Sequence, residues 1–458
     1  METIHILHTN DIHSHFEYWP QIHRLLVDKR KELIASGDAV FLFDIGDHVD
    51  RSHPFTEGTN GKGNVQLLNK AGYDAVTIGN NEGITMSKAA LDDLYEDAQF
   101  DVIVGNLFNT NDELPYWANS STIYTTAKGT KIGVIGATAY YKQFYETLDW
   151  KITPSRDQLL NEAEKLVGKT DVIICLSHLG LPEDQLLAAE CPHIDVILGA
   201  HTHHILPEGE YVNNSLLAAT GKFGDFVGHV TVQFNDKKKQ VIDKHASLYR
   251  SAELPVLEED VEEITKYIDV GKKALEEKMF YNAMDLKQNL FGTSELSSYF
   301  GRALIDYTDA DCALFNAGIF LGSLEKGWIT KGDMHRILPH PINVCTLELT
   351  GDQLLDVYEQ SLNEELAQIE VKGLGFRGTL MGAILHERLY RNRWGTLFAG
   401  NKEVVPEETY TLATLDMFTF GFFFPLFKEL EKEYYMPDLI RDVLAKYGQN
   451  NGESTTLP

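Results

Sequence analysis

The chain has 458 residues, of which 40 are basic and 68 are acidic, and its formal net charge is −28. This length predicts two domains of about 200 to 250 residues each, and 43% hydrophobic with 24% charged residues is typical of a globular protein. The acidic balance argues against a nucleic-acid polymer or an anionic membrane as partner. It would also repel small anions, so a substrate with a phosphate group would require positive charge supplied locally, for which bound metal ions are a source.

The chain starts directly in an expected strand, without the basic start and long apolar stretch of a secretory signal. Its longest strongly apolar run, Phe418 to Phe427, is far shorter than the roughly 20 residues that span a bilayer. The cysteines show no paired spacing and are interpreted as reduced thiols; they are Cys175, Cys191, Cys312 and Cys345. We therefore expect a cytoplasmic protein, disordered only in the polar run from Gly448 to Pro458.

The first half repeats one pattern, in which a short apolar, β-branched run ends abruptly in small and polar residues. These runs are Ile4 to Leu7, Ala39 to Ile45, Ala75 to Ile78, Val102 to Val104, Val172 to Leu176 and Val196 to Leu198. Helical patterns separate them, as in Ile22 to Leu33 and Ser87 to Leu94. Buried strands of an α/β or layered α+β domain are predicted, closed by strands at Leu216 to Gly221 and His229 to Phe234. Ligands of such sheets gather beyond the carboxyl ends of the strands.

An amphipathic helix is predicted from Leu257 to Met279, where apolar residues recur among acidic and lysine residues. The second half then predicts a helix near Ser294 to Tyr307, a strand from Cys312 to Phe315 and a helix from Gly351 to Leu362. We therefore expect a first domain over residues 1–255, a helical connector over 256–280 and a second α/β domain over 281–458.

Metal-binding side chains recur at the predicted strand ends. They are Asp11, His13, Asp47, Asn80, His178, His201 and His203. Each alone is typical of an ordinary turn, helix cap or surface pair, but their recurrence in one context favours a metal site. Carboxylate, amide and imidazole groups suit Zn, Mn, Fe, Co or Ni. The number of ligands fits two ions about 3.5 to 4 Å apart that share one carboxylate and activate a water.

The order of these residues resembles the calcineurin-like metallophosphoesterases. The motifs concerned are Asp11-x-His13, Gly46-Asp47, Gly79-Asn80-x-Glu82, Ser177-His178 and His201-x-His203. The opening run from His8 to His15 and the second half are similar to the 5'-nucleotidase and UDP-sugar hydrolase family, over nearly the whole chain. The resemblance implies a four-layer metallophosphoesterase domain followed by a C-terminal α/β substrate-recognition domain.

The resemblance also implies a role for each ligand. Asp11, His13 and His203 would hold one metal, and Asn80, His178 and His201 a second, with Asp47 bridging the two. The cofactors would be two divalent ions, Mn, Zn or similar. A metal-activated water would attack the phosphate in line with the leaving group.

The sequence departs from the family at the position after Asn80. The family has a histidine there that contacts the phosphate and an aspartate that orients it, whereas this chain has Asn81 and no such aspartate. An amide can donate a hydrogen bond to the phosphate but cannot transfer a proton. The predicted catalytic residues are therefore Asn81, as a hydrogen-bond donor, and Asp47, as the ligand that bridges the metals. Hydrolysis of substrates with good leaving groups is slowed least by the loss of general acid catalysis. His48 and His53 follow Asp47 closely and are candidates to replace the histidine in part, and the favoured interpretation is that both are surface histidines in a loop.

The predicted second domain also matches its family only in part. Asn316 and Gly318 stand in the expected glycine-rich turn, but the arginine that normally follows is Phe320. Phe376, Arg377 and Phe422 are the remaining predicted substrate-binding residues, the aromatic rings stacking on a base. The aromatic cluster Phe420 to Phe424 equally suits a hydrophobic core, which is the favoured interpretation for Phe422 to Phe424.

The sequence therefore predicts a two-metal hydrolase that cleaves phosphate esters of nucleotides or nucleotide-like compounds, as a monomer or weak dimer. Rival interpretations are a nucleotide-sugar or cyclic-nucleotide phosphodiesterase, and a general phosphatase. A function of a different class, that of a binding protein, also fits the missing histidine and arginine. The chain would then be a metal-containing nucleotide sensor with little turnover.

Overall fold

The computed structural model describes residues 1–451, and the chain divides into two compact units, Met1–Gly271 and Lys272–Pro458. The division falls within α9 (Glu258–Ala274), the helix expected between the domains. This helix ends before Met279, because Lys278–Asn282 forms strand β16 and pairs with β18 (Gly327–Thr330). None of the helices in residues 1–451 is long and apolar enough to cross a membrane.

Unit 1 contains a seven-stranded sheet in the order β15-β14-β1-β2-β3-β4-β6. Its strands are β1 (Glu2–Thr9), β2 (Ala39–Asp44), β3 (Ala75–Val76), β4 (Asp101–Ile103), β6 (Ala118–Asn119), β14 (Phe226–Asn235) and β15 (Gln240–Arg250). Strands β1, β2 and β3 run parallel, so their carboxyl ends lie at the same edge. The sequence predicted five of these seven strands but not β6 or β15.

A second, six-stranded sheet has the order β12-β13-β11-β10-β8-β7. Its strands are β7 (Ser121–Thr125), β8 (Lys131–Thr138), β10 (Val172–His178), β11 (Val196–Gly199), β12 (Glu210–Val212) and β13 (Ser215–Ala218). Strands β8, β10 and β11 are parallel neighbours. The sequence did not predict strands β7, β8 and β12. The short strands β5 (Leu107–Asn109) and β9 (Trp150–Ile152) pair separately.

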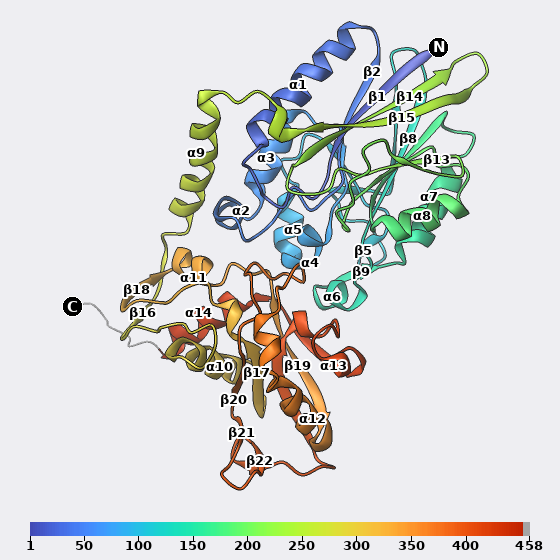
Figure 1. The fold of residues 1–458 in the computed structure, drawn as a ribbon. Helices are drawn as coiled ribbons and strands as arrows, with labels where there is room; N and C mark the ends of the chain where they lie inside the picture. The colour runs from blue at the N-terminus through green and yellow to red at the C-terminus, as the bar shows by residue number, and fades with distance from the viewer. Residues whose placement is uncertain (452–458) are drawn as a thin grey trace. The chain divides into compact units, whose positions relative to one another are not determined.

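The two sheets of unit 1 share one core, in which Ile6 and Phe43 of the first sheet meet Val134, Ile174 and Leu198 of the second. Helices cover the outer faces (Figure 1): α1 (Trp19–Ala35) packs on β2, and α7 (Ser155–Leu166) and α8 (Leu181–Glu190) pack on the second sheet. This helix-sheet-sheet-helix order confirms the four layers expected. The remaining helices are α2 (Pro54–Thr59), α3 (Lys62–Ala71), α4 (Asn80–Thr85), α5 (Lys88–Leu94) and α6 (Lys142–Thr147).

Unit 2 is built on a five-stranded mixed sheet in the order β20-β17-β24-β19-β25. These strands are β17 (Cys312–Asn316), β19 (Asn343–Thr350), β20 (Ile384–Glu387), β24 (Thr409–Leu415) and β25 (Lys432–Leu439), and a small meander comprises β21 (Leu389–Arg391), β22 (Leu397–Ala399) and β23 (Lys402–Glu403). The helices are α10 (Glu295–Thr308), α11 (Lys331–Ile337), α12 (Gly351–Ser361), α13 (Pro425–Glu429) and α14 (Ile440–Asn451). Helix α10 begins where Ser294 caps it, since the Ser297 N–H donates to the Ser294 hydroxyl.

Two expectations about the second half need correction. The disorder expected from Gly448 onward is wrong for residues 448–451, which continue helix α14, because Gly448 packs on the Phe280 ring; residues 452–458 lie outside the described part. The aromatic cluster also divides. Phe424 is 0% exposed and packs on Phe418 and Phe427, whereas Phe422 is 74% exposed, so the core interpretation is right for one and wrong for the other.

We expect Phe424→Ala to destabilise unit 2 by about 3 to 5 kcal/mol, because it removes a fully buried ring and leaves a cavity. Phe422→Ala is the matched control and should change the free energy of unfolding by less than about 0.5 kcal/mol. Urea unfolding followed by circular dichroism measures both. Equal effects of the two substitutions would contradict the packing described.

Candidate metal centre

The carboxyl ends of strands from both sheets of unit 1 bring the predicted metal ligands together. Two groups have ligand atoms within 4.8 Å of one another: Asp11, His13 and His203, and Asp11, Asp47 and His178. Asp47 Oδ2 lies 3.6 Å from His13 Nε2 and 3.5 Å from His178 Nε2. The position of this carboxylate between imidazoles of different strands is the one that a bridging ligand requires.

The backbone at these residues is unusual. Asp11, His13, Asp47, His201 and His203 all have φ between 49° and 70°, in the left-handed region that residues other than glycine rarely adopt. Such conformations cost energy and persist where the surroundings enforce them, often at functional sites. Five of the seven predicted ligands share this feature, which distinguishes their loops from ordinary turns.

Glycine and a buried carboxylate hold two of these loops together. A Cβ atom on Gly79 would lie 2.0 Å from Asp47 Oδ1, so only glycine allows the β3 loop to approach Asp47 this closely. The Glu82 carboxylate accepts hydrogen bonds from the backbone N–H groups of Asp47 (3.0 Å), Val49 (2.9 Å) and Gly79 (2.9 Å). Burial, together with the nearby Asp47 charge, raises the pKa of Glu82 to about 7. The sequence motif contained Glu82, but its role in joining the loops emerges only in the fold.

The donor set fits a divalent cation. His178 Nδ1 lies 2.7 Å from the Ile45 carbonyl oxygen, to which its N–H donates, and this leaves the Nε2 lone pair free. That Nε2 atom and Asn80 Oδ1 are both buried and have no hydrogen-bond partner within residues 1–451. Unpartnered buried acceptors cost about 1 to 3 kcal/mol each. A cation accepting both lone pairs would remove that cost.

The electrostatics agree with this fit. Burial disfavours a charged imidazole, but the Asp47 and Asp11 carboxylates outweigh burial and raise the pKa of His178 to about 10. The carboxylates thus attract a positive charge to His178 Nε2. Because a proton and a metal ion compete for the same lone pair, either can supply that charge.

His201 lies beside this cluster. Its backbone N–H donates to Asp11 Oδ2 (3.0 Å), and its Nε2 lies 3.2 Å from the hydroxyl oxygen of Tyr141. Burial and the neighbouring His178 lower the pKa of His201 to about 4, so the ring is neutral and can bind a metal. Tyr141 follows β8, and the missed strand is the reason why the sequence did not indicate this residue: the same strand-end pattern applies there.

Asn81, expected to contact the phosphate, lies elsewhere. Its side chain is 6% exposed, with Nδ2 2.9 Å from His13 Nδ1 and donating to the Val49 carbonyl oxygen at 3.1 Å. The structure therefore places this amide behind His13, where it supports a predicted ligand, and this contact gives no support to a direct catalytic role. The cause is local packing that a one-residue comparison with a family motif does not reveal.

Of the two histidines considered as substitutes, His48 requires a correction. His48 is buried, not on the surface; its ring packs against Trp19, and burial lowers its pKa to about 3. His53 caps helix α2, since the Phe55 N–H donates to His53 Nδ1 (3.2 Å). The His48 ring therefore packs in the core, and the His53 ring caps a helix.

Four of the predicted substrate-binding residues are packed around His340 and the end of β17. Asn316 is buried and donates to the Met381 carbonyl oxygen (2.8 Å), and a Cβ on Gly318 would lie 2.1 Å from the Leu380 carbonyl oxygen. Phe376 is 4% exposed and stacks on His340, whose Nδ1 accepts from the half-buried Arg377 backbone N–H (2.8 Å). Phe376 therefore belongs to the core, which corrects the expectation that its ring is open to a base.

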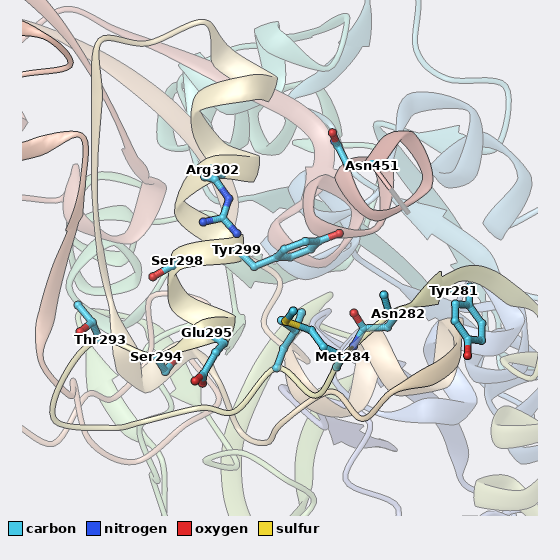
Figure 2. A pocket seen from close by; sticks show the side chains of 12 residues that line it. Tyr281, Asn282, Met284, Thr293, Ser294, Glu295, Ser298, Tyr299, Arg302 and Asn451 are labelled. Carbon is cyan, nitrogen blue, oxygen red and sulfur yellow. Dashed lines mark hydrogen bonds between the residues drawn. The ribbon is translucent and has the colours of Figure 1, made fainter. Parts of the chain in front are cut away.

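Unit 2 also contains a cavity of about 660 Å³ at the start of helix α10. Figure 2 shows the side chains around it, among them Asn282, Glu295, Tyr299 and Arg302. Its lining includes none of the residues predicted to bind metal or substrate. The cavity therefore does not bear on the metal centre.

Comparison with known proteins agrees with the geometry of both units. Residues 4–204 match the family described as calcineurin-like phosphoesterase, and residues 271–428 match the 5'-nucleotidase C-terminal domain. The metallophosphoesterase YunD of Bacillus subtilis strain 168, itself uncharacterized, is 38% identical over 97% of this chain and 98% of its own length. The chain belongs to the metallophosphoesterases.

More distant relatives extend this result. The 5'-nucleotidase of Vibrio cholerae is 23% identical to this metallophosphoesterase and is matched over 77% of this chain and 74% of its own. The NAD nucleotidase structure of Haemophilus influenzae shares the fold, with a TM-score of 0.67 and 15% identity over 98% of this chain and 96% of the other. As a member of its family, the metallophosphoesterase is a hydrolase that acts on phosphate esters and uses divalent metal ions.

We expect Asp47→Asn to lower the affinity of the metallophosphoesterase for Mn²⁺ by about 100-fold or more, since losing a supporting residue alone costs about 10- to 100-fold. Asparagine keeps the shape but removes the charge near His13 and His178. His204→Ala is the control, because this exposed residue adjoins His203 and its ring hydrogen-bonds to Thr202 rather than to a predicted ligand. Elemental analysis after dialysis measures the metal content. Full metal content in Asp47→Asn would contradict the site.

Proposed function

We propose that the protein hydrolyses phosphate esters of nucleotides or nucleotide-like compounds with two divalent ions, Mn, Zn or similar. The observation that carries the proposal is the buried cluster in which His178 Nε2 and Asn80 Oδ1 lack hydrogen-bond partners beside Asp47. The proposal assigns Asp11, His13, Asp47 and His203 to one ion, and Asp47, Asn80, His178 and His201 to the other. The nucleotide part rests on the relatives named as nucleotidases.

Bound divalent cations would stabilise charge on the phosphoryl group and make a hydroxide nucleophile available near neutral pH. The protein's own residues hold the geometry. Ile45 fixes the His178 ring, Glu82 joins the loops of Asp47 and Asn80, and Asn81 supports His13 from behind. Preorganised ligands of this kind need no rearrangement during the reaction.

The position of Asn81 bears on the leaving group. Its amide carries no transferable proton and contacts His13 and Val49. Losing general acid catalysis costs about 10²- to 10⁴-fold, and this cost is smallest for leaving groups that depart without a proton. We therefore favour phosphoanhydrides, activated diesters and aryl phosphates over nucleoside monophosphates, and nucleotide-sugar or cyclic-nucleotide diesterase activity is the second candidate.

Recognition of the nucleoside by unit 2 is a further part of this proposal, through Arg377 and the exposed ring of Phe422, with the buried Asn316 and Gly318 shaping the turn beside Arg377. A cytoplasmic location is proposed from the four free, buried cysteines, which suit a reducing compartment. A monomer or weak dimer is the proposed state.

A panel of substrates tests the reaction. After metal removal with EDTA and addition of Mn²⁺, we expect hydrolysis of an aryl phosphate and of a nucleoside polyphosphate at least 10-fold faster than that of the corresponding monophosphate. Phosphate release measures hydrolysis of the aryl phosphate, the nucleoside polyphosphate and the monophosphate. Liquid chromatography follows hydrolysis of cyclic nucleotides and nucleotide sugars. Binding without turnover across the whole panel would instead favour a nucleotide sensor.

The role of Phe422 is tested separately. Phe422→Ala should lower kcat/KM for a nucleotide by about 5- to 10-fold, since stacking on a base contributes about 1 to 3 kcal/mol. It should leave kcat/KM for an aryl phosphate unchanged, and the ratio of the two activities is the readout. If the ratio stays constant, Phe422 does not recognise the base.

A further inference from the structure

Tyr141 lies between strand β8 and helix α6, next to the predicted ligand His201. Its ring is half-buried, and its hydroxyl oxygen lies 3.2 Å from His201 Nε2. The two rings meet edge to face at a centroid distance of 6.0 Å. Within residues 1–451, the hydrogen bond described for the Tyr141 hydroxyl is the one to His201.

The exposure of the predicted ligands identifies the open side of the metal centre. Asp11, Asp47 and His178 are fully buried and form its floor, whereas Asn80, His201 and His203 are half-exposed. A substrate phosphate must approach from the half-exposed side. Tyr141 contacts a ligand on that side, while Asn81 contacts His13 from behind.

Metal binding would leave the O–H group of Tyr141 unable to donate a hydrogen bond to His201, whichever nitrogen of His201 is the ligand. If Nε2 binds the cation, its lone pair is no longer available to Tyr141. If Nδ1 binds instead, the neutral ring carries its one proton on Nε2 and donates to the Tyr141 oxygen. In both cases the phenol O–H cannot donate to His201 Nε2 and is available to another acceptor.

We infer that Tyr141 is a substrate-binding residue whose hydroxyl donates a hydrogen bond to a phosphoryl oxygen when the site is loaded with metal. The inference rests on the proposed two-metal function and adds a residue that recognises the phosphate group common to all its substrates. It also gives a neutral donor to a chain whose net charge of −28 opposes anions. A phenol donor suits this place because a hydrogen bond to a charged oxygen is stronger than one between neutral groups.

Tyr141→Phe tests the inference, because it removes the hydroxyl and keeps the ring. Tyr140→Phe is the matched control: it makes the same chemical change one residue earlier, on a side chain that is 44% exposed. Titration calorimetry of inorganic phosphate into the Mn²⁺-loaded full chain should show about 10-fold weaker binding for Tyr141→Phe, the loss of one hydrogen bond to a charged group. The values of kcat/KM for an aryl phosphate and a nucleotide should fall together by a similar factor. Metal content should stay at the wild-type level, and Tyr140→Phe should match wild type throughout.

Two results would overturn the inference. Unchanged phosphate affinity in a fully loaded Tyr141→Phe protein would exclude the hydrogen bond. Weaker Mn²⁺ binding with normal phosphate affinity of the loaded protein would make Tyr141 a residue that positions His201. Failure of the proposed function has a different signature, since the wild-type chain would then bind no Mn²⁺ or hydrolyse no member of the substrate panel.

Discussion

The Asp47 carboxylate is the group on which the metal centre depends. Its Oδ1 accepts the Asn81 backbone N–H at 2.7 Å, and its Oδ2 lies within 3.6 Å of both His13 and His178. One side chain thus connects loops that follow β1, β2, β3 and β10, from both sheets. The contact is possible because Gly79 has no Cβ, which would otherwise occupy the position of Asp47 Oδ1.

Bringing these groups together has an electrostatic consequence. Buried carboxylates require compensation, and here imidazoles lie beside them, among which His178 Nε2 has no hydrogen-bond partner within residues 1–451. His178 illustrates the balance, because Asp47 and Asp11 raise its pKa to about 10 in spite of complete burial. The same excess of negative charge that favours a proton on His178 favours a divalent cation, and the cation would also attract the phosphate that the net charge of the chain repels.

Asn81 stands where the resemblance to the 5'-nucleotidase family implies a histidine, and the structure gives it contacts of its own. The shorter amide turns to His13 and Val49 and becomes part of the support of a ligand. On the proposed function, a phosphate would meet groups at the half-exposed side of the site, and the Tyr141 hydroxyl lies there beside His201. The inferred phosphate donor therefore follows a different strand from the one that precedes Asn81.

The sequence by itself determined the layered fold, the strands that precede the candidate ligands and the set of metal-type ligands, because strand periodicity and the polar residues at strand ends are local features. It determined helix starts such as Ser294 for the same reason. Only the tertiary structure decided which way side chains face: that Asn81 turns behind His13, that His48 is buried, and that Phe424 is core while Phe422 is exposed. Burial and side-chain direction depend on contacts with residues distant in the chain, and no local pattern contains them. Tyr141 belongs to the same class, since its partner His201 is 60 residues away and comes from another strand of the sheet.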